Sequence, residues 1–400
     1  PACSAGRPDA SNAATSSSRD GTSVAHPTIP SAPENRAAAV TTVEVNRPLL
    51  DIPAMVPAHP APTRRGRLAP PPHPGGTGPP ACQAGTVDDL TEPDTEPRAE
   101  ITIEPARTAA VGSTTVRRAL PRRARRTVGA WCFADHFGPA QGGLGGIGPH
   151  PHIGLQTVTW LLDGHLLHRD SLGSEQSIRP GQLNLMTAGH GIAHAEEADL
   201  TSTGTSHGTQ LWVALPEATR NGPAAFEHHA ELPHVDLGAA TATLLIGGLA
   251  GSAAGVVSPA RADTDHLGAQ LDLRGPLELD LDPRYEHALY PLDGPVTVAG
   301  RPLAVGEVAY LPPGHQALSV GPADRTPAAS GAGPVRVMLL GGVPFPEEVF
   351  MWWNYVARTR DEVDAANRAW TEGTDRFGDP GSVLERIPAP TPPWQRPDPA

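Results

Sequence analysis

Two histidines one residue apart, His150 and His152, lie in the glycine-rich and apolar stretch "GPHPHIGLQTVTWLLDG", residues 148–164. In a β-strand, residues i and i+2 point to the same face, so both imidazoles could be directed at one point in space. Imidazole is the commonest side-chain ligand for metals in proteins. Taken alone, the pair is compatible with a metal site or with the polar face of an exposed strand.

A second pair with the same spacing, His194 and Glu196, lies in "MTAGHGIAHAEEA", residues 186–198, just after another strand-like run. Two antiparallel strands that bring the two pairs together would supply three imidazoles and one carboxylate. With no thiolate nearby, this donor set suits Fe(II), Mn, Ni, Cu or Zn, and histidines with one carboxylate and open positions are typical of non-haem iron oxygenases. We therefore predict metal ligands at His150, His152, His194 and Glu196, while the donor set leaves the identity of the metal open.

Three features near these pairs allow alternative interpretations. His190 and His194 have the i, i+4 spacing of a helical ligand pair, but two glycines in "AGHGIAHAE" oppose a helix, so we place His190 in the pocket wall. His168 and Asp170, in "HRDSLG", either hold a ligand imidazole in one tautomer or serve only a strand and turn. The stretch "GGLGGIGP", residues 142–149, fits a lid beside the metal better than a phosphate-binding loop, because no helix follows it.

The charge and hydropathy of the chain limit its partners. A formal charge of −13 argues against a nucleic-acid surface, which needs a clustered basic face. One basic run, "VRRALPRRARR", is either a localisation signal or anion patch, or the solvated edge of a strand and loop, which we favour. The apolar run at residues 237–251 is too short and too rich in glycine for a membrane helix. We expect a soluble, cytoplasmic protein that binds neither membrane nor nucleic acid directly.

The three cysteines, Cys3, Cys82 and Cys132, form no CxxC pair. They make neither a disulfide framework nor a zinc knuckle and suit a reducing compartment. We interpret Cys132 and the nearby His136 as structural. The chain begins at Pro1 rather than Met, so the sequence is compatible with further residues upstream, including a signal peptide.

The first 98 residues are rich in Pro, Ala and Ser, and no Phe, Tyr or Trp occurs before Trp131. A segment without large apolar side chains cannot offset the entropy lost on ordering, so we expect a disordered extension over residues 1–98. From residue 99 on, short segments rich in Val, Leu, Thr and Trp alternate with Gly and Pro. This pattern is typical of an all-β sandwich or barrel.

The β-pattern occurs twice, because residues 277–320 repeat the order of strands and glycine turns of residues 161–194. In the second copy the comparable positions hold Glu286, His287 and His315 without an HxH pair, so we expect no metal there. The segment "RDEVDAANRAW" has helical apolar spacing. We expect a first domain over 99–230, a second over 231–380 closed by a C-terminal helix, and a disordered tail over 381–400.

The stretches "HPHIGLQTVTWLLDG", "MTAGHGIAHAE", "VGAWCFADHFGP" and "HRDSLG" together resemble the pirin family of the cupin superfamily, and "MWWNYVARTRDEV" resembles the C-terminal element of its bacterial members. The resemblance runs from about residue 101 to 378. It implies two cupin-type barrels, of which the first holds one Fe(II) and the second is usually empty. The family's ligands fall on His150, His152, His194 and Glu196.

The chain departs from the general cupin pattern in three respects. Cupins commonly have a Glu where this chain has Gln156, a position that is not a ligand in pirins, so the carboxylate role stays with Glu196. The glycine spacing before His150 also differs, and the Pro-rich extension lies outside the family.

The resemblance implies two different functions. One is a quercetin 2,3-dioxygenase-like activity, in which adjacent hydroxyl and keto oxygens of a flavonol chelate the metal and Glu196 accepts the hydroxyl proton. The other is a non-enzymatic, iron-dependent, redox-sensing regulator that binds a protein partner. A third interpretation is a cupin that binds metal without a dedicated reaction, since fold and metal do not establish turnover. In each case we expect a monomer.

Overall fold

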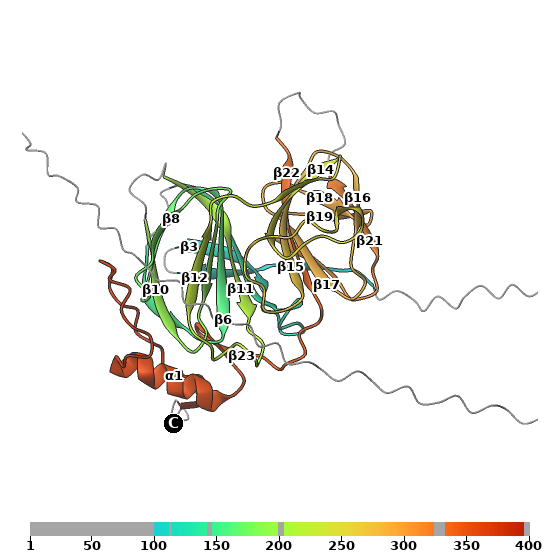
Figure 1. The fold of residues 1–400 in the computed structure, drawn as a ribbon. Helices are drawn as coiled ribbons and strands as arrows, with labels where there is room; N and C mark the ends of the chain where they lie inside the picture. Colours follow the sequence, from blue (N-terminus) through green and yellow to red (C-terminus); the bar gives the residue numbers. More distant parts are fainter. Residues whose placement is uncertain (1–99, 112–113, 142–145, 199–203, 324–332, 396–400) are drawn as a thin grey trace, which may run out of the picture. The chain divides into compact units, whose positions relative to one another are not determined.

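The computed structural model describes residues 100–111, 114–141, 146–198, 204–323 and 333–395. The predicted extension over residues 1–98, with Cys3 and Cys82, lies outside the described residues, as do residues 142–145 of the predicted lid. The described part consists of two β-barrels and a C-terminal helix, so the predicted all-β, two-barrel architecture is confirmed (Figure 1).

The first barrel consists of a seven-stranded and a four-stranded sheet, both antiparallel. In the larger sheet, strand β6 (Leu155–Asp163) is buried on both faces up to Leu162, because one face lines the barrel and the other packs against the second barrel. The larger sheet has the order β12 (Ala225–His229), β9 (Leu183–Thr187), β6 (Leu155–Asp163), β11 (Thr205–Ala214), β4 (Trp131–Gln141), β3 (Thr114–Leu120) and β2 (Arg107–Val111). The smaller has the order β5 (Ile147–His152), β10 (Ile192–Ala198), β7 (Leu166–Asp170) and β8 (Glu175–Ile178).

The second barrel repeats this arrangement. Its larger sheet has the order β1 (Thr102–Pro105), β20 (Glu307–Leu311), β17 (Glu286–Pro291), β22 (Val335–Gly342), β15 (His266–Leu273), β14 (Ala240–Ile246) and β13 (His234–Asp236). Its smaller sheet has the order β16 (Leu277–Asp280), β21 (Ala317–Pro322), β18 (Val296–Val298) and β19 (Arg301–Leu303). The sequence pattern assigns residues from 99 on to the first domain, but β1 pairs with β20 of the second barrel. Strand patterning indicates that a segment is a strand and does not indicate which sheet edge it joins.

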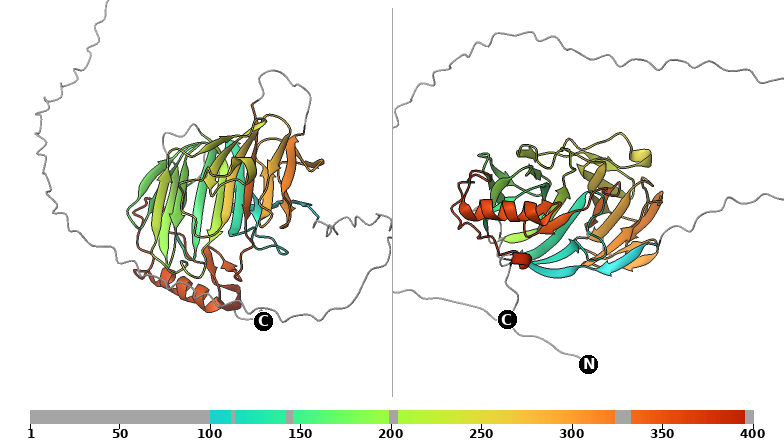
Figure 2. Two further views of the ribbon diagram at one scale, coloured as in Figure 1. Left: turned by 45° about the vertical axis from the view of Figure 1, so that its right-hand side comes forward. Right: turned by 90° about the horizontal axis from the view of Figure 1, so that it is seen from below.

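The two barrels lie side by side (Figure 2). Buried side chains of their two large sheets form one shared core. Two tryptophans of the first barrel mark the contact: Trp131 Nε1 donates to the Leu267 carbonyl at 2.9 Å, and Trp160 Nε1 donates to Gln270 Oε1 at 2.8 Å. Buried indole N–H groups need hydrogen-bond partners, so these two bonds help to fix the position of one barrel relative to the other.

The interior of the second barrel is occupied by apolar side chains, among them Leu271, Leu289, Leu311 and Leu339. Glu286 and His287 of this barrel have structural contacts. Glu286 accepts hydrogen bonds from the Gly129 backbone N–H and the Tyr310 hydroxyl, each at 2.7 Å, and so joins the barrels. Burial lowers the pKa of His287 to about 4.

The C-terminal segment returns to the first barrel. It contains the hairpin β23 (Phe350–Trp352) and β24 (Tyr355–Ala357), helix α1 (Arg360–Glu372) and the 3-10 turn η2 (Pro393–Gln395). The other 3-10 turn, η1 (Gly251–Ala253), lies in the second barrel. Thr359 caps α1 by accepting from the Glu362 backbone N–H, and the helix ends at Gly373, whose φ of 68° suits glycine.

Helix α1 buries Val363, Ala366 and Trp370 against Ile153 and Ala193 of the first barrel. The sequence order assigns this helix to the second domain, and the structure places it on the first instead. An amphipathic pattern predicts a buried face, whereas the surface that covers this face depends on the path of the chain. No helix among the described ranges has the length and apolar character needed to cross a membrane.

The structure also differs from the expected disordered tail. Trp370 Nε1 donates to the Ile387 carbonyl, and the Ile387 backbone N–H donates to the Pro149 carbonyl, both at 2.9 Å. Residues 381–395 therefore run along the first barrel, and residues 396–400 lie outside the described part. Proline-rich sequence disfavours sheets and helices, but an extended backbone can still bind to a preformed surface.

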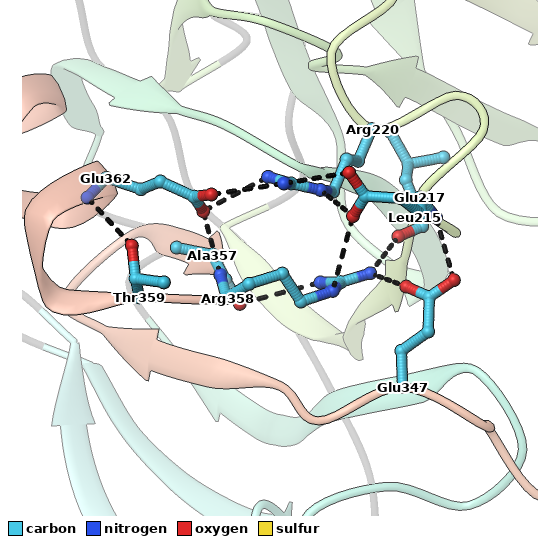
Figure 3. Close-up of polar contacts among 8 residues, drawn as sticks. All are labelled: Leu215, Glu217, Arg220, Glu347, Ala357, Arg358, Thr359 and Glu362. Carbon is cyan, nitrogen blue, oxygen red and sulfur yellow. Dashed lines mark hydrogen bonds and ion pairs between the residues drawn. The ribbon is translucent and has the colours of Figure 1, made fainter.

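Two arginines attach this C-terminal segment to the first barrel (Figure 3). Arg358 donates to the Leu215 carbonyl at 2.9 Å and forms an ion pair with Glu347. Arg220 donates to both carboxylate oxygens of Glu362, each at 3.1 Å. Both arginine side chains are largely buried, so these bonds are shielded from solvent.

Candidate metal centre

The two predicted histidine pairs meet on neighbouring strands of the smaller sheet of the first barrel. Strands β5 and β10 are antiparallel, with His194 opposite His150 and Ile192 opposite His152. This register directs the three imidazoles to one place, as the i, i+2 spacing predicts. The register shifts between His194 and Glu196, so a bulge separates the carboxylate from the histidine pairing.

His150, His152 and His194 form a cluster in which one ring nitrogen from each lies within 4.8 Å of the others. All three side chains are buried, and the Nε2 atoms of His152 and His194 are 3.1 Å apart. Metal–imidazole bonds are about 2.0–2.1 Å long, so two imidazole nitrogens on one ion lie about 2.9–3.4 Å apart. The spacing of His152 and His194 therefore fits one metal ion, and His150 is close enough to belong to the same group.

The outer ring nitrogens show which atoms face the centre. His150 Nδ1 contacts the Gly148 carbonyl and His152 Nδ1 contacts the Asn354 carbonyl, both at 2.9 Å. A carbonyl only accepts, so each Nδ1 carries the proton and donates it. Each Nε2 then presents a lone pair, which is the form that binds a metal.

Burial lowers the pKa of all three histidines, that of His150 to about 4 and those of His152 and His194 well below the ordinary value. A buried imidazolium ring is costly, so the neutral ring is favoured. Neutral imidazoles are ready to bind a metal without first releasing a proton.

Glu196 lines the same cavity as the three histidines but does not belong to their cluster. Its side chain is buried, and burial raises the pKa of its carboxyl group to about 7. The structure thus brings together three of the four predicted ligands, and the fourth stays a prediction.

The cavity in front of the histidines has a volume of about 570 Å³. Phe133 and Trp212 form part of its wall and stack with ring centroids 4.2 Å apart and planes at 17°. Arg118 and Asp135 provide a charged part, joined by two hydrogen bonds of 2.7 and 2.6 Å. Aromatic and apolar side chains thus share the cavity wall with the histidines and a group of polar and charged side chains, a combination found in sites that bind small organic molecules.

Sequence reasoning missed the contribution of the β23–β24 hairpin. Its two tip residues, Trp353 and Asn354, line the cavity, and the Asn354 carbonyl holds His152. Trp353 has a φ of 52°, a backbone conformation that is rare for a large side chain and persists only where packing imposes it. The stretch "WWNYV" could have indicated that this turn is buried against the barrel, since two adjacent tryptophans are unusual in a solvated loop.

Other singled-out residues lie away from the cluster. Cys132 is buried, its pKa is raised to about 12 by burial, and its Sγ contacts the Trp212 carbonyl, so the thiol is inert. His136 packs against His207, with Nε2 atoms 3.0 Å apart. His190, which we expected in the pocket wall, is exposed and is not among the residues that line the cavity.

The basic run is held within the fold. Arg117 donates to the Gly138 carbonyl at 2.9 Å, Arg118 pairs with Asp135, and Arg125 lies 3.2 Å from the ring centre of Tyr310. The run is a strand followed by a loop, as expected, but Arg117 and Arg118 are only partly exposed and not solvated as predicted.

Two cupin-type barrels with a histidine cluster inside the first define the chain as a bicupin with a candidate metal centre. The Pirin family model matches residues 113–213, and the model of the Pirin C-terminal cupin domain matches residues 267–378. The chain belongs to the pirin family.

Similar proteins agree with this assignment. A provisionally named quercetin 2,3-dioxygenase of Pseudomonas aeruginosa is 48% identical over 298 residues, which cover 72% of this chain and 90% of the relative. A pirin-like protein of Caulobacter vibrioides is 36% identical over 285 residues, 68% of this chain and 94% of the relative. A crystal structure of a quercetin 2,3-dioxygenase from Acinetobacter baumannii matches with a TM-score of 0.68 and 39% identity, over 74% of this chain and 97% of that one.

Proposed function

We propose that this protein is a metal-dependent dioxygenase that cleaves a flavonol such as quercetin with O2. The observation that carries the proposal is the convergence of His150, His152 and His194 on a cavity of about 570 Å³ with aromatic walls. Cavities of this size suit small organic ligands. The names of the Pseudomonas and Acinetobacter relatives support the choice of substrate class.

The three histidines hold the metal in this proposal, and Glu196 is the fourth ligand. We propose Fe(II), because a histidine–carboxylate set with open positions is typical of non-haem iron oxygenases. When bound, the metal acts as a Lewis acid toward the adjacent hydroxyl and keto oxygens of the flavonol.

The chain's own side chains bind and orient the substrate. A carboxylate oxygen of Glu196 accepts the flavonol hydroxyl proton, because Glu196 lines the cavity beside the histidines. The aromatic wall formed by Phe133 and Trp212 packs against the planar rings. The hairpin tip at Trp353 and Asn354 narrows access of water to the cavity.

The reaction needs no further co-reactant. In this reaction the two carbon–carbon bonds to C3 of the flavonol's central ring would break, C3 would leave as carbon monoxide, and both atoms of O2 would enter the ester that remains. The electrons that reduce O2 come from the flavonol itself, so the proposal requires no external reductant.

The test is anaerobic purification with metal analysis, followed by flavonol absorbance and O2 uptake measured under air. We expect the wild type to contain iron and consume flavonol, and His152→Ala to lose both properties. His190→Ala is the matched control, because this exposed histidine lies outside the cavity lining. If the purified protein is active but contains Mn, Ni, Cu or Zn in place of iron, only the proposed identity of the metal would have to be corrected.

Glu196→Gln tests the proposed base separately. We expect turnover to fall at least about 100-fold, since general-base catalysis contributes that much or more. Undiminished loss of flavonol in this variant would refute the assignment of Glu196. A wild type that binds metal but does not consume flavonol would overturn the proposed function and favour the non-enzymatic, iron-dependent regulator that binds a protein partner.

A further inference from the structure

Two buried polar side chains, His168 and Asp170, lie behind His194, outside the cavity lining. Both are on β7, which pairs with β10 so that Asp170 is opposite His194 and His168 is opposite Glu196. His168 is stacked on Phe226, with ring centroids 4.5 Å apart and planes at 13°. Its ring is therefore held in place on one face.

The hydrogen bonds of Asp170 show where His168 carries its proton. Asp170 Oδ1 accepts from the backbone N–H groups of Leu172 and Ser174, at 2.9 and 3.1 Å. Asp170 Oδ2 lies 3.1 Å from His168 Nε2. A carboxylate only accepts, so His168 Nε2 is the donor.

The position of the His168 proton determines where His194 carries its own proton. A His168 ring with one proton, placed on Nε2, has a lone pair on Nδ1. This atom lies 3.4 Å from His194 Nδ1, which must then be the donor. His194 is left with its lone pair on Nε2, the atom that faces His152 Nε2 at 3.1 Å.

We propose that Asp170 and His168 are positioning residues that fix the tautomer and the ring orientation of His194 for metal binding. This inference rests on the metal centre proposed above. Partners of this kind commonly raise the affinity of a metal site by about 10–100-fold. His150 and His152 have backbone carbonyls in the same role, so His194 is the one ligand of the three whose outer partner is a side chain that can be substituted.

Asp170→Asn should reverse the direction of the chain of hydrogen bonds. Only one oxygen remains in the variant, and the two backbone N–H groups of Leu172 and Ser174 hold it. The amide nitrogen then faces His168 Nε2 and donates to it, which moves the His168 proton to Nδ1. Two N–H groups would face each other between His168 and His194, and His194 would be driven to carry its proton on the metal side.

The experiment measures the affinity of metal-free protein for cobalt(II), by competition with a chelating dye, together with the cobalt absorption spectrum. We expect His168→Leu to lose about 10–100-fold in affinity and Asp170→Asn at least about 10-fold. His168→Gln should lose less than His168→Leu, because an amide both accepts and donates. Glu175→Gln is the control, since Glu175 lies on the neighbouring strand β8 and pairs with the exposed side of Arg169.

Wild-type affinity in His168→Leu would overturn the positioning role while leaving the metal centre intact. If His168→Leu does not fold, the comparison of His168→Gln with Asp170→Asn decides, and equal, wild-type affinities in both overturn the proposal. A wild-type protein that binds no cobalt(II) would overturn the metal centre itself, and the positioning role with it.

Discussion

Gly154 provides a sharp test of the contact between the C-terminal hairpin and the first barrel. It has a φ of +66°, and a Cβ built on it would lie 2.1 Å from the Val356 carbonyl oxygen of β24. Real Cβ contacts are essentially never shorter than 3.0 Å, so Gly154→Ala must move residue 154 and Val356 of β24 apart by about 0.9 Å. Asn354, two residues before Val356, holds His152 and would move with the strand.

The loss of stability has two parts that a control variant separates. A left-handed backbone costs a non-glycine residue about 1–2 kcal/mol, and forced overpacking adds about 1–3 kcal/mol. Gly181→Ala carries only the first cost, because Gly181 has a φ of +83° and a Cβ added there would meet no atom within 4 Å. The free energy of unfolding should therefore fall about 1–3 kcal/mol further in Gly154→Ala than in Gly181→Ala.

Urea denaturation of both variants gives the free energies, and a cobalt(II) titration gives the metal affinity. We expect Gly154→Ala to bind cobalt(II) about 10-fold more weakly than the wild type, and Gly181→Ala to bind it normally. Equal losses of stability in the two variants would refute the close packing of β24. A destabilised Gly154→Ala with wild-type metal affinity would refute the role of the Asn354 carbonyl.

Three further predictions concern stability and use the urea midpoint as readout. Trp370→Ala should lower the free energy of unfolding by about 3–5 kcal/mol, because the indole is fully buried, whereas Glu372→Ala at the exposed helix end should change it by less than about 0.5 kcal/mol. Arg358→Met keeps an apolar stem but removes the donor to the Leu215 carbonyl, and should cost about 1.5–3 kcal/mol; an unchanged midpoint would contradict the importance of this bond. Acid should weaken the fold through His287, whose pKa is lowered from 6.5 to about 4. Above pH 6.5 both states hold a neutral ring; between pH 6.5 and 4 the unfolded state binds the proton first, so stability falls by up to about 3 kcal/mol. His287→Gln should lose less stability over this range than the wild type does.

The clustering of the three histidines was predictable from the sequence. Period-two spacing placed His150 with His152 on one strand face, and the strand-like run before His194 suggested a second strand to bring beside it. The structure brings these three side chains together. The position of Glu196 was less predictable, because the register shift after His194 depends on the pairing of β10 with β5 and not on the spacing of residues along β10.

Local sequence patterns could not predict that residues 102–105 join the second barrel and that helix α1 packs on the first. Residues 102–105 and helix α1 each have an amphipathic or strand-like pattern that predicts an element type. The partners of these elements are distant in sequence: Thr102 pairs with Tyr310, and Val363 of α1 packs in one cluster with Ile153. Such contacts depend on the paths of the loops and on which sheet edge is free. Neither of these produces a periodic pattern of residues in the sequence.

The bond between His152 and Asn354 spans 202 residues of chain. During translation, strands β5 and β10, which carry all three histidines, therefore leave the ribosome long before Asn354 is added. The carbonyl of Asn354 is the group that orients His152. The first barrel can begin to fold during synthesis, but its metal site reaches its final form only when the last segment of the chain has been made and has bound. In the proposed metal centre, His152 would thus gain its orienting carbonyl only with the last segment, and a product cut short after the second barrel would have the three histidines without the carbonyl that holds His152.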